Sequence, residues 1–422
     1  MKVLDYTLLI LLFSVILITS LGSVDMAAPQ WLYLSIVALI SFVITKDKFK
    51  SFLEIKKTAI SFYLIFIALA VISFSYTNNV TISLMDLGRL LTNLTLIYIF
   101  YIRFKRSKVT FFNIALIVSV FLIVESIVSL RSLIIQIYYY GMNFSGVQSV
   151  NVDVFKGFAG NRNITTASII CKVPFLLYLI LSSKKILIKI ALSLLMIIPI
   201  LVLFLIGSRT ALLSLSVITI SLLAYSLMQL IKLKNNAYII NFLALIGIIG
   251  IAYLLSNYFT PSNTTAIERL STIKATNEAS SNRFILWSDA LDYIKEHPVV
   301  GCGIGNWKVE SSKYWSSNIG DNYLVPYHAH NDFLEITTEL GIIGGLYYLL
   351  LFVSLFLFLF KSLILLKSTK GAVYFTLFAS LTAYFIDSFF NFPFERPIMQ
   401  VTFILLVSYI SSLMNQSKKE KS

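Results

Sequence analysis

The chain has 422 residues, of which 58% are hydrophobic and only 13% are charged, and its mean hydropathy is +0.84. Apolar runs of about 20 residues recur along the whole length, which excludes a soluble protein and indicates helical membrane spans. The net charge of +14 does not point to nucleic acid, because most basic residues lie in short loops between the apolar runs. The two cysteines, Cys171 and Cys302, do not make a disulfide framework, since Cys171 falls inside a predicted span.

The apolar runs predict an all-α polytopic membrane protein with about twelve transmembrane helices and a single integral membrane domain over residues 1–422. The first run follows Met1 and Lys2 and is compatible with a signal peptide. We interpret it as an uncleaved span, because its removal would leave eleven spans and upset the charge pattern. The predicted spans are 6–21, 30–45, 58–76, 85–102, 109–130, 164–182, 186–207, 210–231, 237–257, 340–360, 371–390 and 397–413.

The distribution of basic residues predicts the orientation. With the N-terminus in the cytoplasm, the predicted cytoplasmic loops and tails hold 21 of the 34 lysines and arginines. The predicted outer loops hold 11, six of them in one long loop, and the outer loops 22–29 and 77–84 hold none. By the positive-inside rule, both termini are therefore expected in the cytoplasm.

Two outer loops are long, residues 131–163 and 258–339, and long loops are usually functional or disordered. The second lies between spans nine and ten and is rich in Trp and Tyr. Within it, Phe284, Trp287, Leu291 and Ile294 recur at helical spacing and predict an amphipathic helix. Ser280, Ser281 and Asn282 are candidate caps, and Pro298 lies beyond the end. Such a helix can lie on the membrane or cover a site from outside.

The stretch from His328 to Gly345 places ionisable side chains directly against an apolar helix. Ionisable groups at a membrane edge are costly and mark function. The alternative is that they are ordinary polar residues at a water interface. The polar residues of this stretch are His328, His330, Asn331, Asp332, Glu335 and Glu339.

Two arginines on the predicted outer face complete a candidate site. Arg209 lies in the short turn between spans seven and eight, and Arg283 begins the amphipathic helix, where a helix N-terminus already favours anions. Either can instead be an ordinary interface or surface arginine. Together with His330, the acid/base candidate, they suggest handling of a phosphate or diphosphate leaving group.

Other chemistries have weaker support. The sequence has no HExxH, no GxSxG, no P-loop and no GxGxxG. His328, His330 and Asp332 offer metal-ligating atoms, but an HxH pair is weak evidence for a metal. A transporter would place charged groups near the bilayer midplane, and the candidates there are scattered. These are Asp86, Arg89, Glu125, Lys172 and Asp387.

Five segments resemble, in order, the O-antigen ligase and polymerase superfamily of bacterial inner-membrane glycan transferases, over residues 157–398. The most specific has the ligase spacing: His330 and Asn331, nine residues, Gly341, two residues, and Gly344. The five are GFAGNRN (157–163), GSRTALLSL (207–215), NRFILWSDALDYIKEHPVVGCGIGNW (282–307), HAHNDFLEITTELGIIGG (328–345) and NFPFERPI (391–398).

The resemblance implies a glycosyltransferase-C-like fold and a metal-independent active site without cofactors on the outer face. It implies that Arg209 and Arg283 bind the diphosphate of an undecaprenyl-linked glycan donor and that His330 is the general base. Asn331 is expected to hold the histidine or the acceptor, and Glu335 to orient the imidazole. With His328, these two are also predicted to contact substrate.

The predicted reaction is a single inverting displacement. An acceptor hydroxyl, deprotonated by His330, attacks the anomeric carbon, and undecaprenyl diphosphate leaves. The histidine spacing favours a ligase with lipid A-core as acceptor, at the periplasmic face of a bacterial inner membrane. A polymerase, a protein O-oligosaccharyltransferase and a lipid-linked glycan flippase remain alternatives. Expected partners are the lipid-linked glycan, a hydroxyl acceptor and the bilayer, but no nucleic acid.

Overall fold

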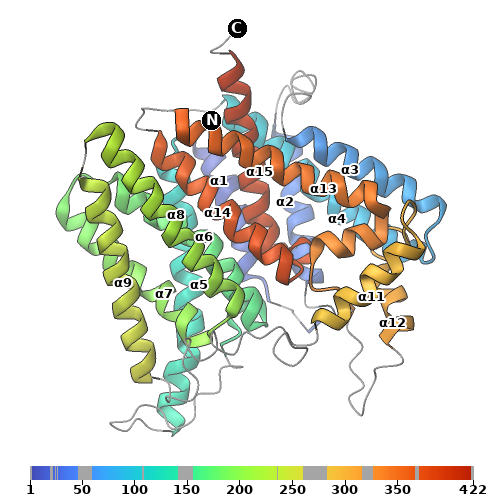
Figure 1. Ribbon diagram of the computed structural model, residues 1–422, viewed down its shortest axis with the longest axis horizontal. Helices are drawn as coiled ribbons and strands as arrows, with labels where there is room; N and C mark the ends of the chain where they lie inside the picture. Colours follow the sequence, from blue (N-terminus) through green and yellow to red (C-terminus); the bar gives the residue numbers. More distant parts are fainter. Residues whose placement is uncertain are drawn as a thin grey trace. The chain divides into compact units, whose positions relative to one another are not determined.

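In a computed structural model of the chain, the regular elements of the described part are all helices (Figure 1). That part comprises residues 2–19, 22, 23, 25, 27–45, 59–106, 109–140, 155–234, 236–259, 283–315, 327–365 and 370–419, and no strand occurs in it. The predicted all-α fold is confirmed. The chain divides into two compact units, and the boundary between them crosses α13 and α14. Unit 1 comprises Met1–Gln30, Ser107–Thr272 and Leu359–Ile386, and unit 2 comprises Trp31–Arg106, Ile273–Phe358 and Asp387–Ser422.

Unit 1 is a set of long apolar helices packed side by side. Helix α6 packs between α5 and α7, and α9 packs against α7 and α8. A buried ion pair joins α5 to α6, with Lys172 Nζ 2.8 Å from Glu125 Oε2. The elements are α1 (Lys2–Phe13), η1 (Ser14–Leu17), α5 (Phe111–Tyr140), η5 (Gly157–Ala159), α6 (Arg162–Ser182), α7 (Ile186–Ile206), α8 (Arg209–Leu233), α9 (Ala237–Phe259) and most of α14 (Gly371–Phe390).

Unit 2 is organised around α4 and α15, which pack along each other and against α3. Helix α15 starts with Pro397, a residue suited to the first helical position because its missing N–H has no partner there in any case. The elements are α2 (Ala28–Ile44), α3 (Ile60–Ile72), η3 (Ser73–Ser75), α4 (Val80–Arg106), α11 (Arg283–Glu296), α12 (Trp307–Trp315), the larger part of α13 (Asp332–Leu365), η7 (Pro393–Glu395) and α15 (Pro397–Lys419).

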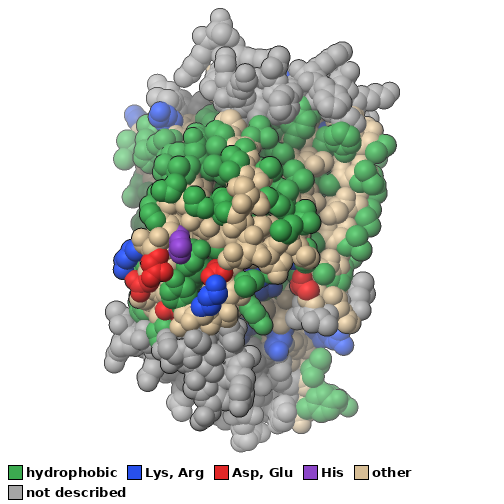
Figure 2. All heavy atoms as spheres, turned by 90° about the vertical axis from the view of Figure 1, so that its right-hand side faces the viewer, with side chains coloured by type: hydrophobic (Ala, Val, Ile, Leu, Met, Phe, Trp, Pro, Cys, Tyr) green, Lys and Arg blue, Asp and Glu red, His purple; other side chains and the backbone are tan. Residues whose placement is uncertain are grey.

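Nine helices in the described ranges are long and apolar enough to cross a membrane, and they coincide with predicted spans four to twelve. The first three predicted spans coincide with shorter apolar helices, Val3–Leu17, Ala28–Ile44 and Ile60–Ser75. The predicted multi-pass fold is confirmed. On the face in Figure 2, hydrophobic side chains form a broad band and charged side chains gather along its lower margin, as expected where a membrane surface meets water.

The predicted start of the tenth span at residue 340 coincides with the break in α13 at Gly341, and Asn331 caps a preceding polar helix, residues 332–340. One predicted span boundary is wrong. The fifth span reaches Tyr140, so part of the predicted outer loop 131–163 is helical. The predicted caps Ser280, Ser281 and Asn282 lie outside the described residues, as do residues 141–154 and 260–282 of the two long loops.

Helix α11 is where the amphipathic helix was predicted, but its buried face is a different one. Leu286, Ala290 and Tyr293 point into unit 2, where Ala290 and Tyr293 pack with Cys302, Trp307 and Ala329. The predicted apolar face is largely outside, with Phe284 41% and Leu291 45% exposed. The predicted helix is therefore present, and most of its predicted apolar face is not packed into unit 2.

A break at Gly341 shapes the start of α13. Its φ of 69° is left-handed, and a Cβ there would lie 2.2 Å from the carbonyl oxygen of Val299. The loop after α11 lies against this break: Cys302 N–H donates to Thr338 O, and Ile342 N–H donates to Pro298 O. Only glycine satisfies both the backbone angle and the close approach, so Gly341 fixes the loop against the first turns of α13.

Candidate functional site

His330 lies in the tight turn that leads into α13, and its backbone is left-handed, with a φ of 52°. A residue other than glycine in this region stores strain, and such strain concentrates at functional sites. Its Nδ1 is buried and has no hydrogen-bond partner in the described part of the chain. A buried nitrogen of this kind requires an explanation, and an atom that meets a substrate is one.

Three helices of unit 2, namely α13, α11 and α15, begin near His330. Helix α13 starts two residues later, with the Asn331 side chain accepting the N–H groups of Phe333 and Leu334 at 3.0 and 3.1 Å. Helix α11 starts with Arg283, whose Nη2 donates to Asn391 Oδ1 at 3.1 Å, in the segment that leads to α15. Because each helix N-terminus carries a partial positive charge, the region favours an anion.

Basic side chains add to this positive field. Burial lowers the pKa of His330 most, and the charges of Arg283, His328 and Arg396 lower it further, to about 3. His330 is thus a neutral imidazole at physiological pH, able to accept a proton but a weak base while these cations are uncompensated. An anion bound beside the arginines would raise its pKa.

Phe392 ties the turn to the segment before α15. Its ring stacks on His328 with centroids 4.1 Å apart and meets His330 edge-on at 4.9 Å. The guanidinium carbon of Arg396 lies 4.3 Å from the same ring centroid. One phenylalanine therefore holds two histidines and an arginine around itself.

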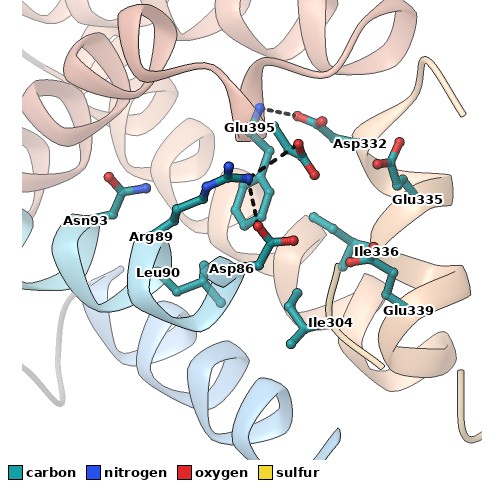
Figure 3. A pocket seen from close by; sticks show the side chains of 11 residues that line it. Asp86, Arg89, Leu90, Asn93, Ile304, Asp332, Glu335, Ile336, Glu339 and Glu395 are labelled. Atoms are coloured by element: carbon teal, nitrogen blue, oxygen red, sulfur yellow. Dashed lines mark hydrogen bonds and ion pairs between the residues drawn. The ribbon is translucent and has the colours of Figure 1, made fainter. Parts of the chain in front are cut away.

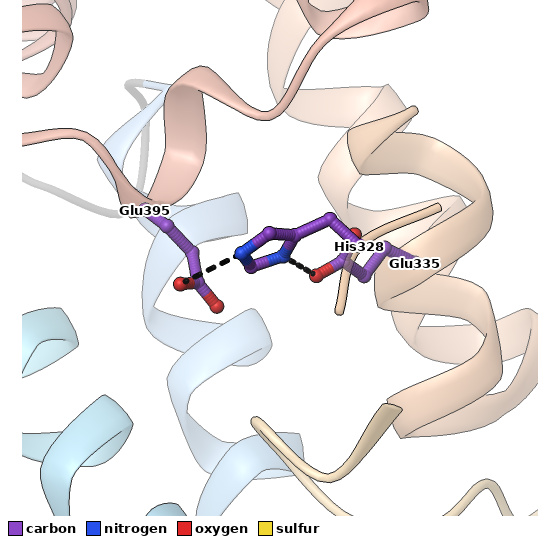
Figure 4. A group of neighbouring side chains, drawn as sticks. All are labelled: His328, Glu335 and Glu395. Carbon is purple, nitrogen blue, oxygen red and sulfur yellow. Dashed lines mark hydrogen bonds and ion pairs between the residues drawn. The ribbon is translucent and has the colours of Figure 1, made fainter. Parts of the chain in front are cut away.

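Glu335 holds His328, not His330 as the sequence predicted. Its Oε1 lies 2.8 Å from His328 Nδ1, and its Oε2 accepts the Ala329 N–H at 2.9 Å (Figure 4). Glu395 lies on the other side of the ring, 3.8 Å from Nε2. Burial alone would lower the pKa of His328, but these two carboxylates raise it above its ordinary value. The two histidines thus have opposite shifts, His328 towards the charged form and His330 towards the neutral one.

A pocket lies beside Glu335 and Glu395, the two carboxylates that contact His328, and charged side chains dominate its lining (Figure 3). Arg89 Nη1 lies 2.7 Å from Asp86 Oδ1 and 3.6 Å from Glu395 Oε2. Lys308 lies 3.3 Å from Glu395 and 3.5 Å from Asp86. The lining residues include Asp86, Arg89, Asn93, Asp332, Glu335, Glu339 and Glu395.

The metal-ligating atoms do not group as the HxH pattern suggested. Ligand atoms of His328, Glu335 and Glu395 lie within 4.8 Å of one another. His330 and Asp332 are not part of this group. Asp332 accepts hydrogen bonds from Tyr348 Oη at 3.3 Å and from the Phe394 N–H at 3.2 Å. Both contacts use Oδ2 of Asp332, which thus joins α13 to the segment before α15.

Arg209 is the first residue of α8, and only Ser208 separates it from the left-handed Gly207 that ends α7. The predicted turn between spans seven and eight is therefore confirmed. Arg209 belongs to unit 1 and Arg283 and His330 to unit 2, so joint action of the two arginines stays a prediction. Asn331 and His328 were predicted to contact substrate. In the structure, Asn331 caps α13, and His328 contacts Glu335.

No role was predicted for Phe392, Glu395 and Arg396, although they lie in the resembling segment 391–398. The signal was the NFPFERPI segment itself, with a charged pair between two prolines. Asp86 and Arg89 had been considered scattered, but tertiary packing brings them to Glu395.

Comparisons with known proteins identify the region that holds most of this site. Residues 192–349 match the sequence family described as "O-Antigen ligase". A protein of Rickettsia conorii described as "Putative polysaccharide ligase" is 34% identical over 87 residues, 18% of this chain and 20% of the relative. A protein of Rickettsia felis with the same description is 34% identical over 80 residues, again 20% of its length. The matches thus span about a fifth of these relatives, and the predicted resemblance is confirmed within residues 192–349.

Proposed function

We propose, from the premise that residues 192–349 carry the O-antigen ligase signature, that this protein transfers a glycan from undecaprenyl diphosphate to an acceptor hydroxyl. Lipid A-core is the favoured acceptor. The observation that carries the proposal is the surroundings of His330: three helix N-termini, Arg283 and Arg396 beside a histidine with a buried, unpartnered nitrogen. Such a place suits a dianionic leaving group next to a proton acceptor.

The chemistry follows from these groups. His330 takes the proton of the acceptor hydroxyl while that oxygen forms a bond to the anomeric carbon of the donor sugar. The bond from that carbon to the diphosphate oxygen breaks, and the electron pair leaves with undecaprenyl diphosphate. Attack from the opposite side inverts the anomeric configuration. Arg283, together with Arg209, compensates the charge that develops on the leaving group.

The low pKa of His330 makes the reaction depend on the donor. In the free protein, burial and the arginines keep this pKa at about 3. A bound diphosphate compensates the arginine charges and raises the pKa towards the working pH, where a general base is most effective. The donor therefore removes the part of the lowering that the arginine charges cause, and His330 becomes a stronger base when the donor is in place. No metal ion is needed for this step in the proposed mechanism.

We further propose that the site faces the periplasm of a bacterial inner membrane and that both termini are cytoplasmic. The excess of lysine and arginine in the alternate loops supports this orientation. A green fluorescent protein fused to the C-terminus should fluoresce, because this reporter does not fold after export in an unfolded state. Alkaline phosphatase is active only after export, so its fusion at the same position should be inactive. The reverse pattern would overturn the orientation.

Cells lacking the gene, complemented with wild type or His330→Ala, test the function. Lipopolysaccharide and surface glycan are compared on one gel. A ligase predicts that the variant accumulates polyprenyl-linked chains that never reach lipid A-core. Core with a single repeat unit would indicate a polymerase, and loss of glycoproteins alone would indicate a protein-glycosylating enzyme. His297→Ala is the control, because this histidine is exposed directly after α11 and its ring contacts Tyr293 rather than His330. If His330→Ala matches wild type in every lane, a flippase becomes the leading alternative.

A further inference from the structure

Arg396 is a basic residue next to His330 to which no function has been assigned. Its guanidinium carbon lies 4.3 Å from the Phe392 ring centroid, and the His330 ring lies 4.9 Å from the same centroid. Its charge contributes to the lowered pKa of His330, in the same direction as that of Arg283. Arg283 and Arg396 thus act on one imidazole from different helices, α11 and the start of α15.

The backbone holds Arg396 in a defined place. Its N–H donates to Pro393 O at 3.1 Å, and its carbonyl accepts the N–H groups of Met399 and Gln400, both at 2.9 Å. Arg396 is therefore the residue that connects η7 to the first turn of α15. The positive end of α15 adds to the charge of its side chain.

The neighbouring carboxylate is shared among several cations. Glu395 lies 3.3 Å from Lys308 Nζ, 3.6 Å from Arg89 Nη1 and 3.8 Å from His328 Nε2. Burial would raise the pKa of Glu395, but the charges of His328, Lys308 and two arginines lower it to about 2. Glu395 thus interacts with four basic side chains, and Arg396 is one of them.

We propose that Arg396 is a donor-binding residue that contacts phosphate oxygens of the lipid diphosphate together with Arg283. The inference rests on the proposed function. A guanidinium that lies over a ring presents its N–H groups at its edge, and these match phosphate oxygens in pairs. Phe392 would then orient Arg396 and His330 relative to each other, so that the diphosphate and the proton acceptor meet at the same sugar.

Binding of the solubilised full-length protein to undecaprenyl diphosphate tests the proposal, with undecaprenyl phosphate as the comparison lipid. Arg396→Gln should weaken diphosphate binding about tenfold or more, the loss expected of one charge-assisted hydrogen bond. Its preference for diphosphate over monophosphate should fall as well. Arg396→Lys keeps the charge but not the paired donors, and should lose less. Lys295→Gln removes an exposed cation of α11, which pairs with Asp292, and should bind like wild type.

A second readout separates binding from a structural role. Removing the Arg396 charge should raise the pKa of His330, so the acid limb of the kcat/KM profile moves to higher pH in Arg396→Gln. A variant that only loosens the fold would lower the melting temperature without moving this limb. If Arg396→Gln does not fold, the lipid preference of Arg396→Lys decides, and an unchanged preference overturns the proposal.

The outcomes distinguish this inference from the proposed function. If wild type binds the diphosphate lipid, Arg283→Gln loses binding and Arg396→Gln does not, the role of Arg396 is wrong and the proposed function stands. If wild type does not bind the diphosphate lipid, the proposed donor is wrong and Arg396 has no diphosphate to contact.

Discussion

Glu335 in the first turn of α13 holds the turn before the helix through His328: its Oε1 lies 2.8 Å from His328 Nδ1. Its other oxygen accepts the N–H of Ala329, the residue before His330. One carboxylate therefore fixes both the ring of His328 and the backbone on which His330 depends. Glu335 acts on the proposed base through the turn, without touching its imidazole.

This contact predicts a pH-dependent stability. The carboxylates of Glu335 and Glu395 outweigh burial and raise the pKa of His328 above 6.5. A histidine with a raised pKa in the folded state adds stability below its unfolded pKa and loses it as pH rises through the folded value. The melting temperature of wild type should therefore exceed that of His328→Gln most at about pH 6, with the difference shrinking at higher pH. Glu335→Gln should remove most of this pH dependence, and a pH-independent difference would contradict the charged pair.

Both arginines are expected to be needed for transfer. Arg283→Ala and Arg209→Ala should each lower transfer about 100-fold or more, the usual loss when a group that stabilises transition-state charge is removed. Each variant should still insert and fold, because both side chains are only partly buried. The measurement is transfer of labelled glycan in membranes. Lys295→Gln is the matched cationic control, and unchanged transfer in either arginine variant would exclude that arginine from diphosphate binding.

Transfer should not depend on a bound metal. Treatment with EDTA is expected to leave the rate unchanged, because His330 and the arginines supply the proton acceptor and the charge compensation in the proposed mechanism. Loss of activity that added zinc restores would instead point to His328, Glu335 and Glu395, whose ligand atoms lie within 4.8 Å of one another. Activity of Glu395→Gln before and after zinc addition would then test that site directly.

Gly341→Ala should destabilise the protein. The new Cβ would meet the Val299 carbonyl oxygen at 2.2 Å, and the φ of 69° is unfavourable for alanine. The expected loss is about 2 kcal/mol or more, from strain and from a displaced loop. Gly250→Ala in α9 is the control, because nothing lies within 4 Å of its added Cβ. Equal melting temperatures for the two variants would show that the approach of Val299 to α13 is not required.

The apolar pattern determined much of the fold because it is a local property. A run of about 20 apolar residues has to be helical in a bilayer, where every backbone N–H and C=O needs an internal partner. This explains why spans four to twelve were predicted within a few residues at most ends. The hydropathy pattern does not reveal the polar helix 332–340 that precedes the break at Gly341, because a short polar helix has no apolar run.

Within the candidate site, the sequence supplied the residues whose chemistry is unusual for a membrane edge. His330, Arg283 and Arg209 could be selected from their residue type and from the predicted loop positions. The sequence could not tell which histidine Glu335 contacts. His328 and His330 both lie within a few residues of Glu335 in the sequence. The left-handed backbone of His330 turns the chain just before α13, and this turn is not visible in the sequence.

What the sequence by itself determined is the set of helices, their multi-pass character and the histidine and arginines that carry acid/base and anion chemistry. What only the tertiary structure decided is which distant residues meet. Arg89 on α4 and Glu395 before α15 lie 3.6 Å apart although 306 positions separate them, and Arg396 reaches the Phe392 ring that His330 also contacts. Helical periodicity fixes each segment, whereas the packing of α4, α11, α13 and α15 sets these contacts, and no local pattern encodes that packing.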